Sequence, residues 1–473
     1  MIRRIVICFV VLSVAFHAAA SAQQAAQRPP NIIFILADDL GVGELGCFGQ
    51  SRIRTPHIDR LAQQGMRFTQ AYSPSPVCAP TRGSLLTGLH LGHAHVRDNM
   101  EVKPEGQHPL PPETVTIAKL LKQRGYATAC IGKWGLGPVG STGEPARQGF
   151  DYFFGHNCQR VAHNLYAPHM WRNDERIVLE GNEPGNLVGQ HYTPDLMADD
   201  AIQWLRSHAH QPFFLYFATP LPHLALQAPE RAVAGYRGKW DDPPYDGSRG
   251  YLPNETPRAT YAAMVTRIDD YVGRIMSELQ ALGIDQNTIV FFTSDNGPTF
   301  DVGGADSDFF DSTQGRRGRK GELYEGGIRV PLIVRWPGRI APGTVSDHLT
   351  ALYDFFPTAA ELAGVTPPPN DGINLVPLLT GKREQPQHAQ LYWEHHSRGG
   401  WQAIRRGNWK ALRVGLHQDS DAPLQLFDLA ADPNETTDLS RQHPQVAAEL
   451  AALMTEARIP SHLPRWNFPV KTP

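Results

Sequence analysis

Five apolar runs, each of a length typical of a buried strand, alternate along this chain with segments of helical pattern. Strands covered on both faces read as continuous apolar runs, and their alternation with helices is typical of a mostly parallel sheet. The sequence therefore predicts an α/β fold in which a large mixed, mostly parallel sheet is sandwiched between helices. The runs are NIIFIL at 31–36, YATACI at 126–131, FFLYFA at 213–218, TIVFFT at 288–293 and VPLIV at 330–334.

Two of the intervening helices carry clear boundary signals. The segment TPHIDRLAQQG places Thr55 at the N-cap, Pro56 in the first turn and Gly65 at the end. The same pattern recurs in the long stretch from Thr256 to Gly283. Both segments are therefore predicted to be helices that begin with a threonine cap.

The N-terminus reads as a secretory signal peptide at residues 1–22. Arg3 and Arg4 precede a short apolar run, and small residues at 20–22 offer a cleavage site. The run is too short to span a membrane, and no later stretch reaches about twenty uninterrupted apolar residues. The sequence predicts an exported protein, periplasmic or secreted, with no membrane span.

The charge balance of the mature chain narrows the choice of partners. Without Arg3 and Arg4 the 44 basic residues become 42, against 47 acidic ones. A net negative surface disfavours nucleic acid and anionic membranes as partners. The one basic cluster, GRRGRKGE at 315–322, is read either as a solvated loop or as a site for a polyanion.

Cysteine usage argues against a disulfide scaffold. Cys8 falls in the predicted signal peptide, which leaves Cys47, Cys78, Cys130 and Cys158 in the mature chain. Four cysteines are few for this length, and none has the spacing of a zinc site. The sequence leaves one disulfide bridge open and does not place it.

Polar residues follow four of the five predicted strands. Asp38 and Asp39 come after the first, Lys133 after the second and His223 after the third. The fourth is followed by Asp295 and Asn296, within SDNG. Each alone could be a turn or surface residue. Open α/β sheets bind ligands at the carboxyl ends of their strands, so together these residues predict one site.

The donor types in this predicted site favour a hard cation. Asp38, Asp39, Asp295 and Asn296 offer three carboxylates and an amide oxygen. Such a set suits Ca²⁺, with Mg²⁺ as the alternative, rather than zinc. A divalent ion at this place would polarise an anionic ester and stabilise the charge that builds on it.

The segment CAPTRGSLLTG at 78–88 resembles the Cys-x-Pro-x-Arg signature of type I sulfatases, which belong to the alkaline phosphatase superfamily. Further segments follow in the order and spacing of that family and cover nearly the whole mature chain. They are PNIIFILADDLGVGELGCFG, TPHIDRLAQQGMRFTQAYS, GYATACIGKWGLG, FFTSDNG, KGELYEGGIRVPLIVRWPG, YDFFPTAAELAG and LFDLAADPNETTDL.

This resemblance implies that a maturation enzyme oxidises Cys78 to Cα-formylglycine. One hydroxyl of the hydrated aldehyde would attack the sulfur of a sulfate ester, and the sulfate would leave as the aldehyde re-forms. Pro80 suits the first turn of a helix, whose N-terminus favours an anion. Arg82 would orient the nucleophile and help to hold negative charge.

The resemblance also assigns roles to the residues at the strand ends. Asp38, Asp39, Asp295 and Asn296 resemble the calcium ligands of the family, with residue 78 completing the set. The groups that bind sulfate and assist the leaving oxygen would be Lys133, His223 and Lys320. A histidine can protonate a departing alkoxide, and lysine supplies a compact cation.

One position departs from the family pattern. Many members have histidine where this chain has Gly135, and that histidine is credited with helping to expel sulfate. The segment GHNCQRVAHNLYAPHMW offers His156, His163 and His169 shortly afterwards. We predict that His163 takes the role, although each of the three could equally be a loop or core histidine.

The chain is expected to divide into a catalytic part at 23–382 and a C-terminal α+β part at 383–473. The second contains strand-like pieces, AQLYWEHH, WQAIRRGNWKALRV and LQLFDL, and then the helical PQVAAELAALMTEARI. The family implies a small antiparallel sheet with a helix, packed near the cleft and shaping the substrate site.

The expected substrate is a sulfate ester, as a small molecule or on an oligosaccharide, because exported members of the family commonly remove O-sulfate from sugars. Arg97, Asp98 and Asn99 are predicted to contact the sugar. The segment 300–314, rich in Asp and Gly, is read as a variable rim loop.

Three alternatives stay open at this point. The chain could be a phosphonate monoester or phosphodiester hydrolase built on the same scaffold. It could be a non-catalytic glycan-binding relative, an alternative that only Gly135 supports. It could keep Cys78 as a thiol nucleophile, although no Cys-His-Asn arrangement accompanies it.

Overall fold

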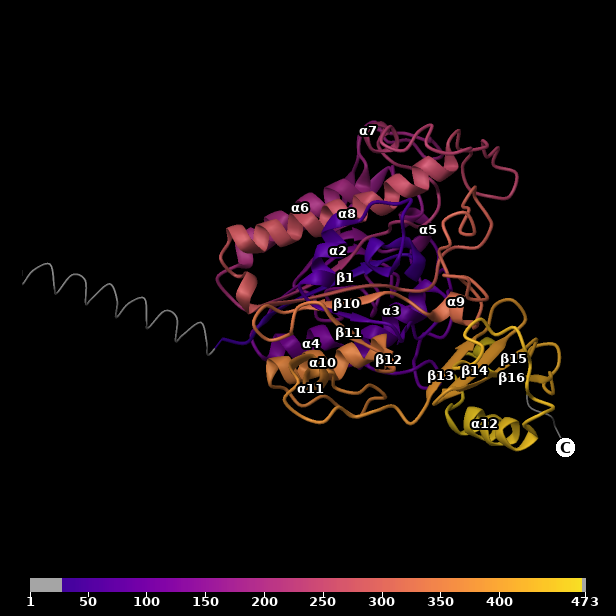
Figure 1. Ribbon diagram of the computed structural model, residues 1–473. Helices are drawn as coiled ribbons and strands as arrows, with labels where there is room; N and C mark the ends of the chain where they lie inside the picture. The colour runs from indigo at the N-terminus through magenta and orange to yellow at the C-terminus, as the bar shows by residue number, and fades with distance from the viewer. Residues whose placement is uncertain (1–27, 470–473) are drawn as a thin grey trace, which may run out of the picture.

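A ten-stranded sheet runs through the molecule, with helices on both faces (Figure 1). The computed structural model describes residues 28–469, so the predicted signal peptide lies outside the described residues. In spatial order the strands are β11 (Thr344–Ser346), β2 (Met66–Phe68), β10 (Leu332–Arg335), β9 (Thr288–Ser294), β1 (Asn31–Ala37), β8 (Phe213–Ala218), β4 (Ala127–Lys133), β5 (Tyr152–His156), β6 (His169–Arg172) and β7 (Glu175–Val178).

The centre of the sheet is parallel and contains four of the five predicted strands. β9, β1, β8, β4 and β5 run parallel to one another, with Ile33 of β1 opposite Leu215 on one side and Val290 on the other. The fifth predicted strand, β10, pairs antiparallel with β9. The sheet is therefore mixed and mostly parallel at its core, which confirms the predicted fold class.

Alternate side chains of the central strands face two hydrophobic layers. Ile33 and Ile35 of β1 pack with the layer that contains α6 and α8, whereas Phe34 and Leu36 pack with the opposite layer. Both layers are visible above and below the sheet in Figure 1. On the first face lie α2 (Pro56–Gln63), α6 (Thr193–His208) and α8 (Pro257–Ala281), and on the second α3 (Cys78–Thr87), α4 (Ile117–Gln123), α10 (Phe355–Ala363) and α11 (Val376–Thr380).

Short elements complete the main part of the molecule. β3 and β12 form a separate parallel pair. The bounds of these elements are β3 (Ala71–Tyr72), α5 (Gln159–Ala162), α7 (Glu230–Val233), α9 (Glu325–Ile328) and β12 (Thr350–Ala351).

Two predicted helices begin at the expected proline, after the expected threonine. α2 starts at Pro56 and α8 at Pro257. Thr55 and Thr256 are the N-cap residues, as predicted, although neither side chain bonds the helix backbone. The Thr55 hydroxyl accepts a hydrogen bond from the Gly46 amide and donates one to the Asp59 side chain instead.

A second, smaller sheet follows Lys382. Its four antiparallel strands are β13 (Leu391–His395), β14 (Trp401–Arg406), β15 (Trp409–Val414) and β16 (Leu424–Asp428). One face packs on α12 (Pro444–Glu456) through Leu450 and Met454, and the other packs against Tyr324 and Tyr353 of the main part. The small sheet and its helix therefore lie directly beside the larger unit (Figure 1).

Cys47, Cys78, Cys130 and Cys158 are all unpaired, so the structure forms no disulfide among them. Within residues 28–469, no helix combines the length and the apolar character that crossing a membrane requires.

Candidate active site

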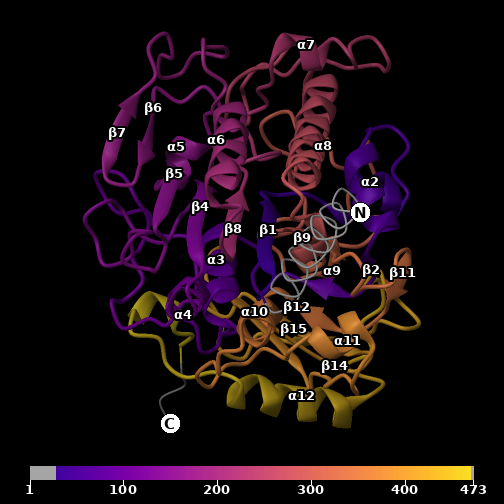
Figure 2. The same cartoon turned by 90° about the vertical axis from the view of Figure 1, so that its left-hand side faces the viewer.

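The carboxyl ends of four neighbouring strands bring the predicted polar residues together. β9, β1, β8 and β4 lie side by side in the sheet (Figure 2). Asp38 and Asp39 directly follow β1, and Asp295 and Asn296 directly follow β9. Lys133 is the last residue of β4. Together with His223, which follows β8, all of them are buried, so they form one enclosed polar cluster.

Cys78 is the first residue of α3, whose ten residues are all buried. The extended backbone of Val77 leads into the helix. The Cys78 Sγ atom lies 3.3 Å from Oδ1 of Asp38. Burial and the nearby Asp38 carboxylate raise the pKa of the Cys78 thiol. The unmodified side chain is therefore a neutral thiol at neutral pH, which disfavours the thiolate alternative.

Arg82 lies one turn further along α3 and connects the helix to two strands. Its guanidinium donates one hydrogen bond to the Lys133 carbonyl and one to Oδ2 of Asp295, each 2.7 Å long. The side chain is fully buried. This two-pronged contact holds residue 78 at a fixed position relative to the carboxyl ends of β4 and β9.

Two lysines each pair with one of the carboxylates. The Lys133 ammonium lies 2.5 Å from Oδ2 of Asp38, and that of Lys320 lies 2.8 Å from Oδ2 of Asp39. Lys320 comes from the basic cluster at 315–322, where its amide donates to the Pro298 carbonyl. Burial lowers the pKa of Lys320, but the Asp39 charge outweighs it and raises that pKa well above its usual value.

The acidic residues also offer oxygen atoms to a cation. Asp39 has a left-handed backbone (φ 68°), and its amide donates to Oδ1 of Asp295. Asn296 donates through its amide nitrogen to Oδ1 of Asp39, while its own Oδ1 is buried without a partner. Burial and the neighbouring Asp38 raise the pKa of Asp295 to about 7. A buried orphan oxygen beside three carboxylates fits a hard divalent cation.

His163 and His223 lie face to face beside this cluster. Their ring centroids are 3.7 Å apart, and Nε2 of His163 lies 3.5 Å from the Lys133 ammonium. Nδ1 of His223 contacts the Leu224 carbonyl, which leaves Nε2 facing Asp39 at 3.6 Å. Burial, followed by the Lys320 charge, lowers the pKa of His223 to about 4. Both rings are therefore neutral at neutral pH.

The other two histidines of that segment have different surroundings. His156 is buried with no partner for either ring nitrogen among the described residues, and His169 contacts the carboxylate of Glu105 at 3.0 Å. Gly135 itself has a left-handed backbone (φ 84°). Of the three predicted candidates, His163 is the one whose ring reaches both Lys133 and His223.

Arg97, Asp98 and Asn99 have protein partners. The Arg97 guanidinium is buried and pairs with Glu394 at 2.9 Å. Asp98 accepts from the Ser397 hydroxyl at 2.7 Å. Asn99 accepts from the Ala79 amide, next to Cys78. The idea that these side chains contact a sugar stays a prediction.

The structure adds three residues that sequence reasoning missed. Tyr251, 43% exposed, places its ring 6.2 Å from that of His223. Phe300 is 36% exposed, and the Arg398 guanidinium lies 4.3 Å above its ring. Arg398 also approaches Gly321, next to Lys320. Only Phe300 had a signal, because it opens the predicted rim loop at 300–314.

Comparison with known proteins defines the class. Residues 30–365 match the sulfatase family model, and residues 319–459 match the model described as N-sulphoglucosamine sulphohydrolase, C-terminal. The chain therefore belongs to the sulfatase family, a family of sulfuric ester hydrolases within the alkaline phosphatase superfamily.

Individual relatives cover most of the chain. It is 36% identical over 378 residues to N-acetylgalactosamine-6-sulfatase of Rattus norvegicus, covering 75% of this chain and 66% of the relative. N-acetylgalactosamine-6-O-sulfatase of Bacteroides thetaiotaomicron is 31% identical over 509 residues, covering 91% and 93%. The crystal structure of Ps i-CgsB in complex with k-i-k-neocarrahexaose superposes with a TM-score of 0.75 at 28% identity, covering 91% and 92%.

Proposed function

We propose that this protein hydrolyses a sulfate ester carried by a sugar or glycan fragment, with a formylglycine formed from Cys78 as its nucleophile. The observation that carries the proposal is the position of Cys78, at the start of α3 and 3.3 Å from Asp38. The hydrated aldehyde supplies a hydroxyl nucleophile that no standard side chain offers. The raised pKa of the unmodified thiol supports the same conclusion, since a neutral thiol is a poor nucleophile.

A calcium ion is proposed as the cofactor, with Asp38, Asp39, Asp295, Asn296 and residue 78 as its ligands. Three formal negative charges in the cluster face three positive ones, from Arg82, Lys133 and Lys320. A bound divalent ion makes the net charge of the cluster positive, and a positive site favours binding of an anionic sulfate. When bound, it supplies Lewis-acid polarisation of a sulfate oxygen.

The remaining side chains have roles that follow from their positions. Lys133 and Lys320 are placed to hold sulfate oxygens, and Arg82 fixes the helix that carries the nucleophile. His223 presents a free Nε2 that can exchange a proton with the leaving oxygen. His163, stacked on His223, is proposed to supply the proton-accepting group that the family pattern places at Gly135.

The rim supports a sugar substrate. Tyr251 offers an exposed ring beside His223, and Phe300 offers one beneath the Arg398 guanidinium. Aromatic faces pack against sugar rings, and a guanidinium binds sulfate or carboxylate in a fork. Relatives named N-acetylgalactosamine-6-sulfatase and N-acetylgalactosamine-6-O-sulfatase, and a neighbour solved in complex with k-i-k-neocarrahexaose, support a substrate of the same class.

Two further features belong to this proposal. We place the boundary between the catalytic part and the C-terminal part after Lys382, where the chain passes from α11 to β13. Export rests on the N-terminal signal at residues 1–22.

A paired assay tests the proposed reaction. Protein made in a host with a formylglycine-forming enzyme is incubated with aryl sulfate, sulfated hexosamines, phosphodiesters and phosphonate monoesters, and released anion is measured. The proposal predicts kcat/KM values for sulfate esters at least about 100-fold above those for the phosphorus esters, a difference of about 2.7 kcal/mol. A higher kcat/KM for phosphodiesters or phosphonate monoesters would contradict the proposed sulfatase activity and favour a phosphorus ester hydrolase. Binding of sulfated sugars without turnover would favour a glycan-binding role.

A further inference from the structure

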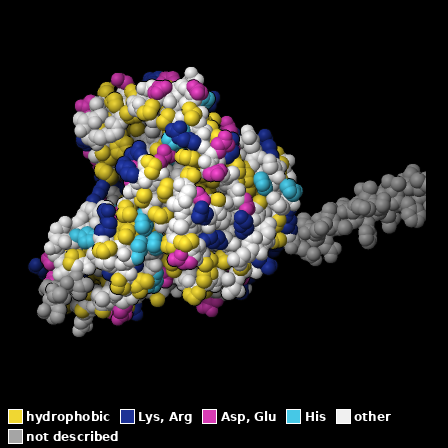
Figure 3. Space-filling model, turned by 180° about the vertical axis from the view of Figure 1, so that it is seen from behind, with side chains coloured by type: hydrophobic (Ala, Val, Ile, Leu, Met, Phe, Trp, Pro, Cys, Tyr) yellow, Lys and Arg dark blue, Asp and Glu magenta, His cyan; other side chains and the backbone are white. Residues whose placement is uncertain are grey.

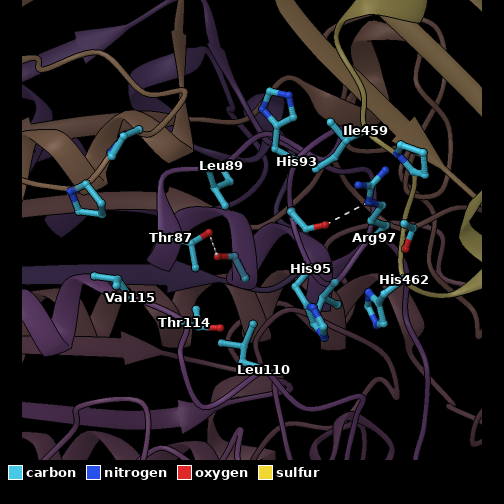
Figure 4. Close-up of a pocket in the computed structure, with 17 residues that line it drawn as sticks. Thr87, Leu89, His93, His95, Arg97, Leu110, Thr114, Val115, Ile459 and His462 are labelled. Atoms are coloured by element: carbon cyan, nitrogen blue, oxygen red, sulfur yellow. Dashed lines mark hydrogen bonds between the residues drawn. The ribbon is translucent and has the colours of Figure 1, made fainter.

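A cavity of about 330 Å³ lies between the loop that follows α3 and the C-terminal tail. In Figure 4, Arg97 lies on the same side of the view as Ile459 and His462, with His95 between them and Leu110. The tail is held here by the bond from the Ile459 amide to the Gly92 carbonyl. Histidine side chains are visible at several places on the face of the molecule shown in Figure 3.

Three histidines from three separate segments lie close together, and two of them, His95 and His462, line this cavity. His95 comes from the loop after α3, His108 from the segment before α4, and His462 from the tail. One ring nitrogen of each lies within 4.8 Å of the others. The centroids of His95 and His462 are 3.9 Å apart, and His108 lies 5.3 Å from each.

The spacing of one nitrogen pair matches that of two ligands on one metal ion. Nε2 of His108 lies 3.1 Å from Nε2 of His462. Two imidazole nitrogens at about 2.0–2.1 Å from a tetrahedral ion are roughly 3.3 Å apart. The three rings are nearly parallel, within 19° of one another, so coordination of one ion requires the rings to rotate until their nitrogen lone pairs converge.

The surroundings hold the rings without satisfying their nitrogens. The edges of His108 and His462 pack against Trp466, at 5.2 and 5.8 Å between centroids. Among residues 28–469, the one hydrogen bond to these imidazoles joins His108 and His462, and none reaches His95.

A second histidine cluster nearby shows the contrast. His90 and His93 also stack, at 4.3 Å, but Asp371 accepts from His93 at 2.9 Å and from the His90 amide at 2.9 Å. That cluster is explained by its hydrogen bonds. Within the described part of the chain, 28–469, the His95 cluster has no carboxylate partner and offers only nitrogen ligands, the set that suits zinc and its neighbours.

We propose that His95, His108 and His462 bind one borderline divalent metal ion of the zinc type, which ties the C-terminal tail to the loop after α3. The three residues lie outside the candidate active site. The ion would link two segments that are far apart in the chain, because His108 and His462 are separated by 354 positions. Arg97 and Asn99 follow His95 in the same loop, so the ion would steady the segment whose Asn99 accepts a hydrogen bond from the Ala79 amide, next to Cys78.

The test is a titration of untagged full-length protein with Zn²⁺ in excess Ca²⁺, which keeps hard-cation sites filled. Wild type is expected to bind one equivalent, and Co²⁺ in its place should give the visible spectrum of a tetrahedral ion. His95→Ala and His462→Ala should each weaken binding at least about tenfold. His210→Ala, at an exposed histidine elsewhere, is the matched control and should bind like wild type.

Hydrogen exchange supplies an independent readout. Zn²⁺ should slow amide exchange in residues 459–469 of wild type and of His210→Ala, and should have no effect there in His95→Ala. The proposal is overturned if wild type binds no Zn²⁺, or if His95→Ala and His462→Ala bind it as tightly as the control.

Discussion

The imidazole rings of His163 and His223 stack with their centroids 3.7 Å apart, although the residues come from different loops. His163 ends α5, and His223 follows β8. Their contact brings a second neutral imidazole to the Lys133 ammonium. Many family members have a proton-transferring histidine where this chain has Gly135. Here a separate segment supplies an imidazole, that of His163, beside His223.

Replacing His163 tests this relationship. His163→Ala should lower kcat for a sulfate ester by about 10²-fold or more, the usual effect of removing a general acid or base. His223→Ala should abolish turnover. His191→Ala, at a half-buried histidine outside the cluster, is the control and should keep the wild-type rate. Full turnover in His163→Ala together with loss in His223→Ala would end the proposed role of His163.

Arg398 is expected to act on substrate affinity rather than on chemistry. Its guanidinium lies at the rim beside Phe300 and Gly321, so Arg398→Ala should raise KM for a sulfated oligosaccharide about tenfold, or about 1.4 kcal/mol. A small aryl sulfate does not reach the rim and should be unaffected. Arg406→Ala removes an exposed arginine of the same small sheet and serves as control. Equal losses on both substrates would contradict the rim assignment.

Calcium removal tests the proposed cofactor. Chelation should abolish activity, and added Ca²⁺ should restore it better than Mg²⁺. Calcium at about 100 times its dissociation constant should raise the free energy of unfolding by about 2.7 kcal/mol. In Asn296→Leu this gain should shrink, because the orphan Oδ1 that fits the ion is gone. A chelated enzyme with full activity would exclude the cation from the reaction.

Glu394 predicts a pH dependence of stability. Burial alone would raise its pKa, but the bond with His396 and the charges of Arg97 and Arg458 outweigh burial and lower the pKa to about 2. A lowered pKa stabilises the fold above the unfolded value, near 4.5, and this stability is lost as pH falls towards 2.

Denaturant titrations of wild type and Glu394→Gln at several pH values measure this contribution. The difference in unfolding free energy should be of the order of 3 kcal/mol at pH 6 and should shrink between about pH 4.5 and pH 2. A difference that stays constant over this window would show that the carboxylate charge of Glu394 contributes nothing.

The sequence predicted the part of the site that depends on strand ends. Asp38, Lys133, His223 and Asp295 each follow an apolar run, and parallel strands necessarily present such residues at one edge. The order β9, β1, β8, β4 was not predictable, because chain order does not determine which strands pair. The fold class, by contrast, follows from the alternation of apolar runs and helices.

Other contacts depend on tertiary packing that no local pattern encodes. Lys320 reaches Asp39 from a loop 281 positions away. Arg398 arrives at the rim from the small C-terminal unit, where its sequence resembles any exposed arginine. Thr55 is the N-cap residue of α2, but its hydroxyl bonds the Gly46 amide and the Asp59 side chain rather than the helix backbone, a choice that the local sequence does not determine.

The measurement that tests the account most directly is the mass of the tryptic peptide that ends at Arg82 and contains residue 78, from protein made in a host with the maturation enzyme. An aldehyde-reactive probe applied to the same peptide is the control. The account predicts a peptide lighter than the cysteine form by the replacement of thiol with aldehyde, and labelled by the probe. An unmodified thiol in nearly all molecules of an active preparation would contradict the proposed nucleophile.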